Sequence, residues 1–131
     1  EISANFMHPI LGMTNQELGI LGENMATLFL RKKGHKIRAR NFRMRHLEVD
    51  IITEFEDKIH VTEVKTRQTA EIGEPWRAVT KAKQKQIIKV TDFYLKENEI
   101  ELETQFDIVS IVHNTYRTDL EYIPDAFTPF V

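Results

Sequence analysis

Two apolar stretches that follow each other closely place the strongest constraint on the fold of this chain. Residues 47–55 and 59–67 are rich in Val, Ile and Thr, and only the polar segment 56–58 separates them. β-Branched residues favour strands, and a short polar segment between two strands favours a tight turn. The sequence therefore predicts an antiparallel pair of strands in this region.

The first of these strands combines acidic and apolar residues in alternation. Glu48 and Asp50 are two residues apart, and Val49 and Ile51 alternate with them. Successive side chains of a strand point to opposite faces of the sheet. We therefore expect Glu48 and Asp50 on one face, and Val49 and Ile51 on the other.

The second strand brings a further acid and a lysine to the same place, because Glu63 and Lys65 share one of its faces. Carboxylates that converge on apolar strands are costly unless they are paired or bound to a metal, and Mg²⁺ prefers such oxygen ligands. We expect Asp50 and Glu63 to hold magnesium or manganese, with support from Glu48. Lys65 would then assist an attacking water. The alternative is an ordinary exposed Glu–Lys surface, which the spacing from Asp50 to Glu63 disfavours.

The rest of the chain predicts a single α/β domain. Helices are expected at 15–33 and 76–96, and further strands at 36–43, 105–113 and 120–123. The order α-β-β-β-α-β, with an edge strand at the end, is typical of a mixed sheet flanked by helices. No repeat or Gly/Ser/Pro-rich linker divides the chain. We therefore expect one domain over 15–131, preceded at 1–14 by a flexible arm or an expression remnant.

Each expected helix carries an apolar stripe at helical spacing. In the first helix the stripe comprises Leu18, Leu21, Met25, Leu28 and Phe29. In the second it comprises Val79, Ala82, Ile87, Val90 and Tyr94. Lys83 falls among these apolar residues, so its ammonium either snorkels to solvent or reaches the acidic site on the neighbouring strands. Gln84, beside it, is a weaker candidate for a supporting contact.

Basic residues are concentrated in two segments, although the net charge of the chain is −2. Residues 31–47 include eight Lys or Arg residues, residues 77–91 include five, and neither segment contains an acid. Such segregation is expected of a protein that binds the phosphate backbone of a nucleic acid. The alternative is two solvated faces balanced by acids elsewhere. The residues expected to contact the nucleic-acid backbone are Arg38, Arg40, Asn41, Arg43, Arg45, Arg67, Lys81 and Lys85.

The composition excludes several classes of site. The chain has no cysteine, which excludes disulfides and thiolate metal sites and fits a reducing cytoplasm. No apolar run approaches the length of a membrane span, so we expect no membrane partner. No nucleotide-binding glycine motif or Ser/Cys–His nucleophile pattern is present, and no small-molecule cofactor beyond the metal is expected.

Short motifs occur in a fixed order from about residue 18 to residue 112. They comprise Gly19, Gly22-Glu23, Ala26, Leu30, Gly34, Asn41 with Arg43, Glu48-Val49-Asp50-Ile51-Ile52, Glu63-Val64-Lys65-Thr66-Arg67, Gly73, Pro75, Ala78-Val79, Lys83-Gln84 and Phe106-Asp107. This ordered set resembles the YraN family of small, largely uncharacterised bacterial proteins. The family is regarded as a branch of the PD-(D/E)xK nuclease-like superfamily, and is similar to Holliday junction resolvases and restriction endonucleases.

The resemblance implies a restriction-endonuclease-like core and cleavage of DNA, with branched or nicked structures as substrates and a homodimer as the assembly. It assigns metal-ligand roles to Asp50, Glu63 and Glu23. It assigns a catalytic role to Lys65. The chain departs from the family at His46-Leu47, where members usually have Gly before the first acid. The alternative is a module that kept the fold and binds nucleic acid or protein without cutting.

Overall fold

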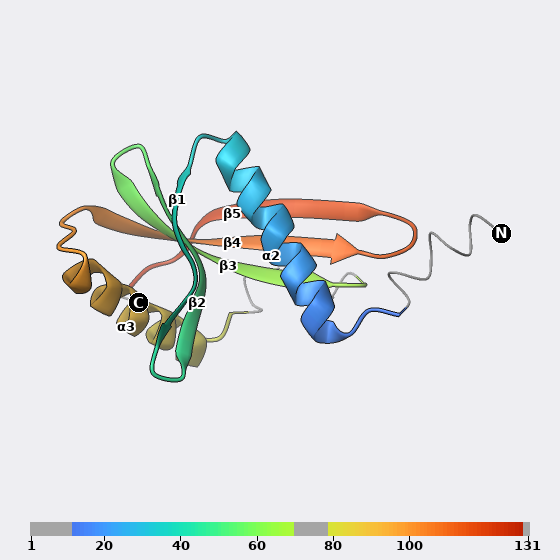
Figure 1. The fold of residues 1–131 in the computed structure, drawn as a ribbon, viewed down its shortest axis with the longest axis horizontal. Helices are drawn as coiled ribbons and strands as arrows, with labels where there is room; N and C mark the ends of the chain where they lie inside the picture. Colours follow the sequence, from blue (N-terminus) through green and yellow to red (C-terminus); the bar gives the residue numbers. More distant parts are fainter. Residues whose placement is uncertain (1–11, 70–78, 130–131) are drawn as a thin grey trace.

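The computed structural model describes residues 12–69 and 79–129, and its elements form a mixed α/β fold (Figure 1). In chain order they are α2 (Asn15–Lys32), β1 (Lys36–Met44), β2 (Leu47–Phe55), β3 (Lys58–Arg67), α3 (Lys81–Glu97), β4 (Glu103–His113) and β5 (Thr118–Phe127). The expected order of elements is confirmed, including the edge strand at the end. Of the expected N-terminal arm, residues 1–11 lie outside the described residues.

One five-stranded sheet, in the order β1-β2-β3-β4-β5, forms the centre of the fold. Neighbouring strands are antiparallel except β3 and β4, which are parallel and are connected through α3. A parallel connection needs a long crossover of this kind, whereas β2 and β3 need only a short turn. Figure 1 shows α2 lying across one face of the sheet.

The core lies on both faces of the sheet, as alternation along β4 shows. Phe106 and Ile108 belong to the hydrophobic cluster under α3, whereas Val109 and Ile111 belong to the cluster under α2. The two helices therefore cover opposite faces. Because β4 is buried on both sides, its apolar run is nearly continuous, as the sequence predicts. Among the described residues, no helix is long and apolar enough to cross a membrane.

The start of α2 is defined by a capping box, but its expected apolar stripe is partly wrong. Oγ1 of Thr14 accepts from the N–H of Glu17, and the Glu17 carboxylate accepts from the N–H of Thr14. The buried residues are Leu18, Gly22, Ala26, Thr27 and Leu30. Leu28 is 53% exposed. The stripe is rotated because the helix approaches β3 at Gly22, where an added Cβ would lie 1.8 Å from Oγ1 of Thr66.

The second helix, α3, begins at Lys81, after Thr80 caps its first turn. The periodicity places its start at residue 76, but residues 76–78 lie outside the described part of the chain. Ala82, in the first turn of α3, is exposed, contrary to the expected stripe. The expected core residues Val79, Ile87, Val90 and Tyr94 are buried.

The last strand, β5, is longer than the sequence predicts. It covers Thr118–Phe127 and continues through Pro124, where the prediction ends the strand at Ile123. Proline has no N–H to donate and is tolerated on an edge strand. The pairing of β4 with this part of β5 shifts register between Phe106 and Ile108.

Candidate active site

The hydrogen-bond ladder between β2 and β3 is interrupted at Asp50. Backbone pairing of the two strands ends where Ile51 lies opposite Thr62. Beyond that point the N–H of Asp50 donates to Oε2 of Glu63 (3.1 Å), and the N–H of Val64 donates to Oδ2 of Asp50 (2.8 Å). Two carboxylates thus replace backbone carbonyls as acceptors, and each is held in place through one of its oxygens.

The same interruption corrects the expected faces of β2. Val49 belongs to the cluster under α3, whereas Ile51 belongs to the cluster under α2. The prediction that they share one face is therefore wrong, because the strand does not alternate strictly through Asp50. The facing strand is distorted at the same level, since Asn41, between the partners of Val49 and Ile51, has a φ of 50°.

Burial controls the charge of the two carboxylates. Desolvation raises the pKa of Glu63 above its ordinary value, and repulsion from Asp50 raises it further. Desolvation also raises the pKa of Asp50, opposed by the N–H of Val64 and reinforced by repulsion from Glu23. A pair of carboxylates that resists carrying two negative charges is stabilised by a bound cation.

Two lysines flank Glu63. Nζ of Lys83, on α3, lies 3.9 Å from Oε1 of Glu63. Lys65 lies two residues farther along β3, on the face of Glu63, and the charges of both lysines lower the pKa of that acid. Gln84 does not contact the acids, because its side-chain amide donates to the carbonyl of Val79 (3.1 Å) and so secures the start of α3.

A second acidic group joins α2, β1 and β2 beside Asp50. Nδ2 of Asn41 donates to Oε1 of Glu23 (2.9 Å) and to Oε2 of Glu48 (3.3 Å). Nε of Arg43 lies 2.9 Å from Oε1 of Glu48. Asn41 and Arg43, which the sequence predicts as nucleic-acid contacts, are therefore tied to acids of the site.

The Asp50–Glu63 pair fits a hydrated divalent cation. Within the described residues, no group of three or more His, Asp or Glu side chains is placed to hold a metal, so Glu23 does not complete a preformed three-ligand set. Mg²⁺ needs only one or two carboxylates, because it keeps several waters and takes phosphate oxygens of a substrate. Oδ1 of Asp50 and Oε1 of Glu63 accept no hydrogen bond from the described residues, which makes them the oxygens available to a cation.

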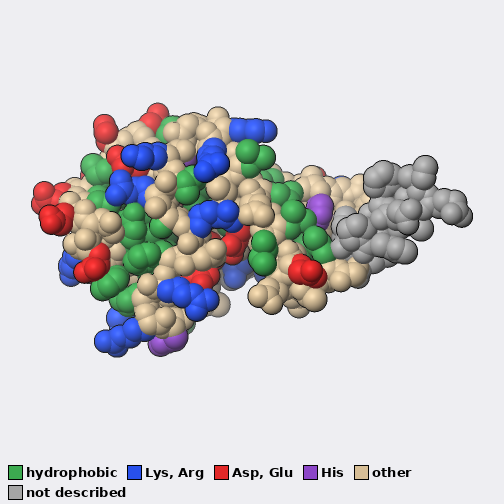
Figure 2. Space-filling view, viewed as in Figure 1, with side chains coloured by type: hydrophobic (Ala, Val, Ile, Leu, Met, Phe, Trp, Pro, Cys, Tyr) green, Lys and Arg blue, Asp and Glu red, His purple; other side chains and the backbone are tan. Residues whose placement is uncertain are grey.

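The residues predicted to contact a nucleic-acid backbone differ in how many contacts they make within the protein. Arg38 is held by Glu54, at 3.0 Å, and by the hydroxyl of Tyr94. Arg40 donates to the side chain of Asn24 (2.9 Å). The exposed members of the set are Arg40, Asn41, Arg43, Arg45, Lys81 and Lys85, and Arg67 is half-buried at the end of β3. Figure 2 shows acidic side chains in a notch in the middle of one face, with Lys and Arg side chains around it.

The sequence predicts that Asp107 caps or pairs within the sheet, and its pairing is confirmed: Asp107 is completely buried on β4, within a polar network whose partners the sequence does not identify. Oδ2 of Asp107 accepts from Nδ1 of His60 (2.8 Å) and from the hydroxyl of Tyr122 (2.7 Å). Oδ1 accepts from Nε2 of Gln105 and from the N–H of Asp125, both at 2.9 Å. Burial alone would raise the pKa of Asp107, but these hydrogen bonds outweigh it and lower the pKa. The one signal in the sequence was an acid within an apolar strand. We call this set the Asp107 network.

Comparisons with known proteins give a consistent family match. Residues 22–111 match the uncharacterised protein family UPF0102. A UPF0102 protein of Christiangramia forsetii is 39% identical over 116 residues, covering 88% of this chain and 98% of that protein. One of Syntrophomonas wolfei is 41% identical over 114 residues, covering 86% and 99%. One of Phocaeicola vulgatus is 38% identical over 115 residues, covering 88% and 95%.

Proposed function

Because this chain belongs to the uncharacterised protein family UPF0102, its function has to be inferred from its own site, and we propose that it is a metal-dependent endonuclease acting on DNA. The observation that supports the proposal most strongly is that backbone N–H groups of β2 and β3 hold the carboxylates of Asp50 and Glu63 in place across the two strands. Each carboxylate accepts one backbone N–H and keeps one oxygen available for a ligand. Such a pair, with Glu63 buried, Asp50 half-buried and the pKa of both raised, is typical of a functional site.

Each residue of the site has a distinct role in this proposal. Magnesium or manganese held by Asp50 and Glu63 would supply an activated water and neutralise charge on the phosphodiester. Lys65, on the face of Glu63, would orient the attacking water or stabilise the negative charge that develops on the phosphate. Lys83 would favour the ionised form of Glu63 through its ammonium, which lies 3.9 Å away.

DNA is the proposed substrate because basic side chains accompany the acidic pair. Lys81 and Lys85 are exposed on α3, the helix that also contributes Lys83. Contacts of this kind bind phosphates without reading base identity. The family resemblance favours branched or nicked DNA, and a homodimer would place two sites on two strands. The absence of cysteine is consistent with action in the cytoplasm.

The test is cleavage of labelled four-way-junction, nicked, single-stranded and plain duplex DNA with Mg²⁺ or Mn²⁺. We expect the natural chain to cut at least one of these substrates, and we expect Asp50→Asn to bind the DNA without cutting it. Asp92→Asn is the matched control, because Asp92 is an exposed acid on α3 that pairs with Lys96 (3.1 Å). A chelator should abolish cleavage by the natural chain and by the control variant.

One result would contradict the proposal. If stoichiometric protein binds these DNAs but cuts none of them with either metal, the chain is a binding module that retains a nuclease fold. Cleavage that survives Asp50→Asn would place the activity elsewhere or in a contaminant. The remaining alternative is a module that binds a protein partner. Raising the salt concentration tests it, because binding to a protein partner lacks the steep salt dependence of phosphate contacts.

A further inference from the structure

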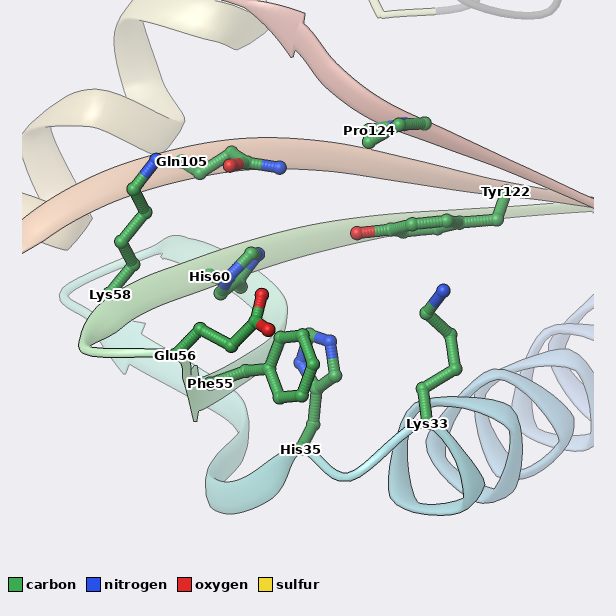
Figure 3. Close-up of a pocket in the computed structure, with 9 residues that line it drawn as sticks. All are labelled: Lys33, His35, Phe55, Glu56, Lys58, His60, Gln105, Tyr122 and Pro124. Carbon is green, nitrogen blue, oxygen red and sulfur yellow. The ribbon is translucent and has the colours of Figure 1, made fainter.

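A pocket of about 330 Å³ lies at the turn between β2 and β3, away from the acidic site (Figure 3). Phe55, which lines it, is five residues beyond Asp50 on β2, a separation of roughly 16 Å along a strand. His60 also lines it and is three residues from Glu63 on β3, so the two side chains point to opposite faces. The pocket has the size of a small-molecule site, and it is separate from the proposed nuclease site.

The Asp107 network determines the polar character of this pocket. His60, Gln105 and Tyr122 line it, and each donates a hydrogen bond to the buried carboxylate of Asp107. With these donors engaged, Oε1 of Gln105 and the oxygen lone pairs of Tyr122 remain as acceptors, beside the second N–H of the Gln105 amide. The inner lining therefore offers acceptors to a ligand that donates hydrogen bonds.

Glu56 adds a carboxylate to this lining from a strained backbone position. Glu56 and Asp57 form the turn between β2 and β3, with φ values of 51° and 61°. Turns of this kind favour Asn and Gly, because other residues are strained in the left-handed region. Figure 3 shows the Glu56 carboxylate directed toward the pocket. A strained residue whose side chain lines a cavity points to a role beyond forming the turn.

The rim of the pocket is basic and one wall is aromatic. Figure 3 shows Lys33 and Lys58 on opposite sides, and Nζ of Lys33 lies 5.0 Å from the centre of the Tyr122 ring. Phe55 stacks on His35 with ring centres 4.4 Å apart. Burial lowers the pKa of His35 to about 4, so its ring is neutral at physiological pH and the wall formed with Phe55 is uncharged.

We propose that this pocket binds a nucleoside monophosphate whose base carries an exocyclic amino group, as in adenosine monophosphate. The amino group would donate to Glu56 and to the acceptors of the inner lining. The base would lie against the wall formed by Phe55 and His35, and the phosphate would reach Lys33 and Lys58 at the rim. This binding needs neither the metal nor cleavage, so the inference does not rest on the proposed nuclease function.

The first experiment is a calorimetric titration of the full chain, without divalent metal, with four matched ligands. Adenosine monophosphate should bind at least about tenfold more tightly than inosine monophosphate, adenosine or inorganic phosphate. Inosine monophosphate has a carbonyl in place of the amino group, adenosine lacks the phosphate, and phosphate lacks the base. Failure of adenosine monophosphate to bind at millimolar concentration overturns the proposal, as does equal affinity for any of the other three ligands.

Two substitutions in the turn separate binding from folding. Glu56→Asn removes the carboxylate but suits the left-handed backbone, so adenosine monophosphate should bind about tenfold more weakly while the unfolding temperature stays equal or rises. Asp57→Gly relaxes the same turn at a residue outside the pocket lining, so the affinity should stay within about twofold. Unchanged affinity in Glu56→Asn overturns the proposal. So does weaker binding in Asp50→Asn, because the ligand would then occupy the acidic site.

Discussion

Two groups of carboxylates lie in the same sheet and have opposite environments, although Asp107 and Glu63 are both buried and Asp50 is half-buried. Asp107 accepts four hydrogen bonds, from three side chains and one backbone N–H, and its pKa is lowered. Asp50 and Glu63 accept one backbone N–H each, repel one another, and have raised pKa values. Burial is therefore not what distinguishes the two groups; the number of donors around each carboxylate is.

The difference separates an acid that stabilises the fold from acids that destabilise it. A buried carboxylate with a full set of donors holds its neighbours in one arrangement. A buried pair with too few donors lowers stability until a cation binds, and such an arrangement persists where function requires it. On this reasoning Asp107 organises structure, whereas Asp50 and Glu63 are the acids that we propose for the chemistry of the site. Substitutions at the two groups should accordingly have different consequences.

The largest expected effect is on the chemistry of the acidic site. Lys65→Ala removes the ammonium that would stabilise the charge developing on the phosphate, while both carboxylates remain. We expect single-turnover DNA cleavage to fall about a thousandfold, or about 4 kcal/mol in activation free energy. DNA binding should change little, because one phosphate contact among several is lost.

The control for this substitution is Lys89→Ala, at an exposed position of α3. It removes the same charge from the surface and should leave the cleavage rate of bound DNA within about twofold. If both lysine variants lose cleavage equally, the loss reports weakened binding, and Lys65 has no special role at the site.

The second effect is on stability, at the Asp107 network. Asp107→Ala leaves the donors of His60, Gln105 and Tyr122 without their shared acceptor in a buried place. We expect the free energy of unfolding to fall by about 3 kcal/mol, measured by urea denaturation. Asp92→Ala, at an exposed acid, should change it by less than about 0.5 kcal/mol. A loss below 1 kcal/mol for Asp107→Ala would mean that the network is not structural.

The contrast between these regions also explains how much could be predicted from sequence. The strands that carry Asp50, Glu63 and Lys65 were predictable, because alternation and a short turn specify a hairpin. The interruption at Asp50 was not, because it depends on side chains that replace backbone acceptors across two strands. That Asp107 pairs within the sheet was predictable, but its donors were not, since they come from β3, β4 and β5 and no local spacing relates them.

The position of α2 shows the same limit. Hydrophobic periodicity predicts a helix over these residues, and the helix is present. It favours Leu28 in the core, but close approach at Gly22 turns Leu28 outward. Periodicity describes which residues are apolar, whereas the contact between Gly22 and Thr66 belongs to the partner strand. A helix face is therefore less predictable than the helix itself.

That contact gives the third prediction. Gly22→Ala places a methyl group against Thr66 and should push α2, with Glu23, away from β3. We expect a loss of about 2 kcal/mol in the free energy of unfolding, together with reduced cleavage. Gly19→Ala is the matched control, because an added Cβ there meets nothing within 4 Å, and it should stabilise by about 0.5–1 kcal/mol. Equal behaviour of the two variants would contradict the close packing of α2 on β3.

The smallest expected effect concerns pH, where the two carboxylate groups should respond with opposite sign. The pKa of Glu63 is raised in the folded state, so the folded protein holds this proton more tightly than the unfolded chain. As pH rises from about 4 through neutrality, the natural chain therefore loses stability relative to Glu63→Gln, whose amide mimics the protonated acid. Glu63→Gln should match the natural chain near pH 4 and be about 1 kcal/mol more stable at pH 8, measured by denaturation without divalent metal.

The pKa of Asp107 is lowered, so its contribution is present at neutral pH and is lost as pH falls below about 4. Asp107→Asn should accordingly be less stable than the natural chain at pH 8 and approach it at pH 3.

Adding Mg²⁺ at pH 8 should close the gap in stability between Glu63→Gln and the natural chain, because only the natural chain binds the cation through this acid. If the difference in stability between Glu63→Gln and the natural chain did not vary with pH, the folded state would not raise the pKa of Glu63. The contrast with Asp107 would then be wrong.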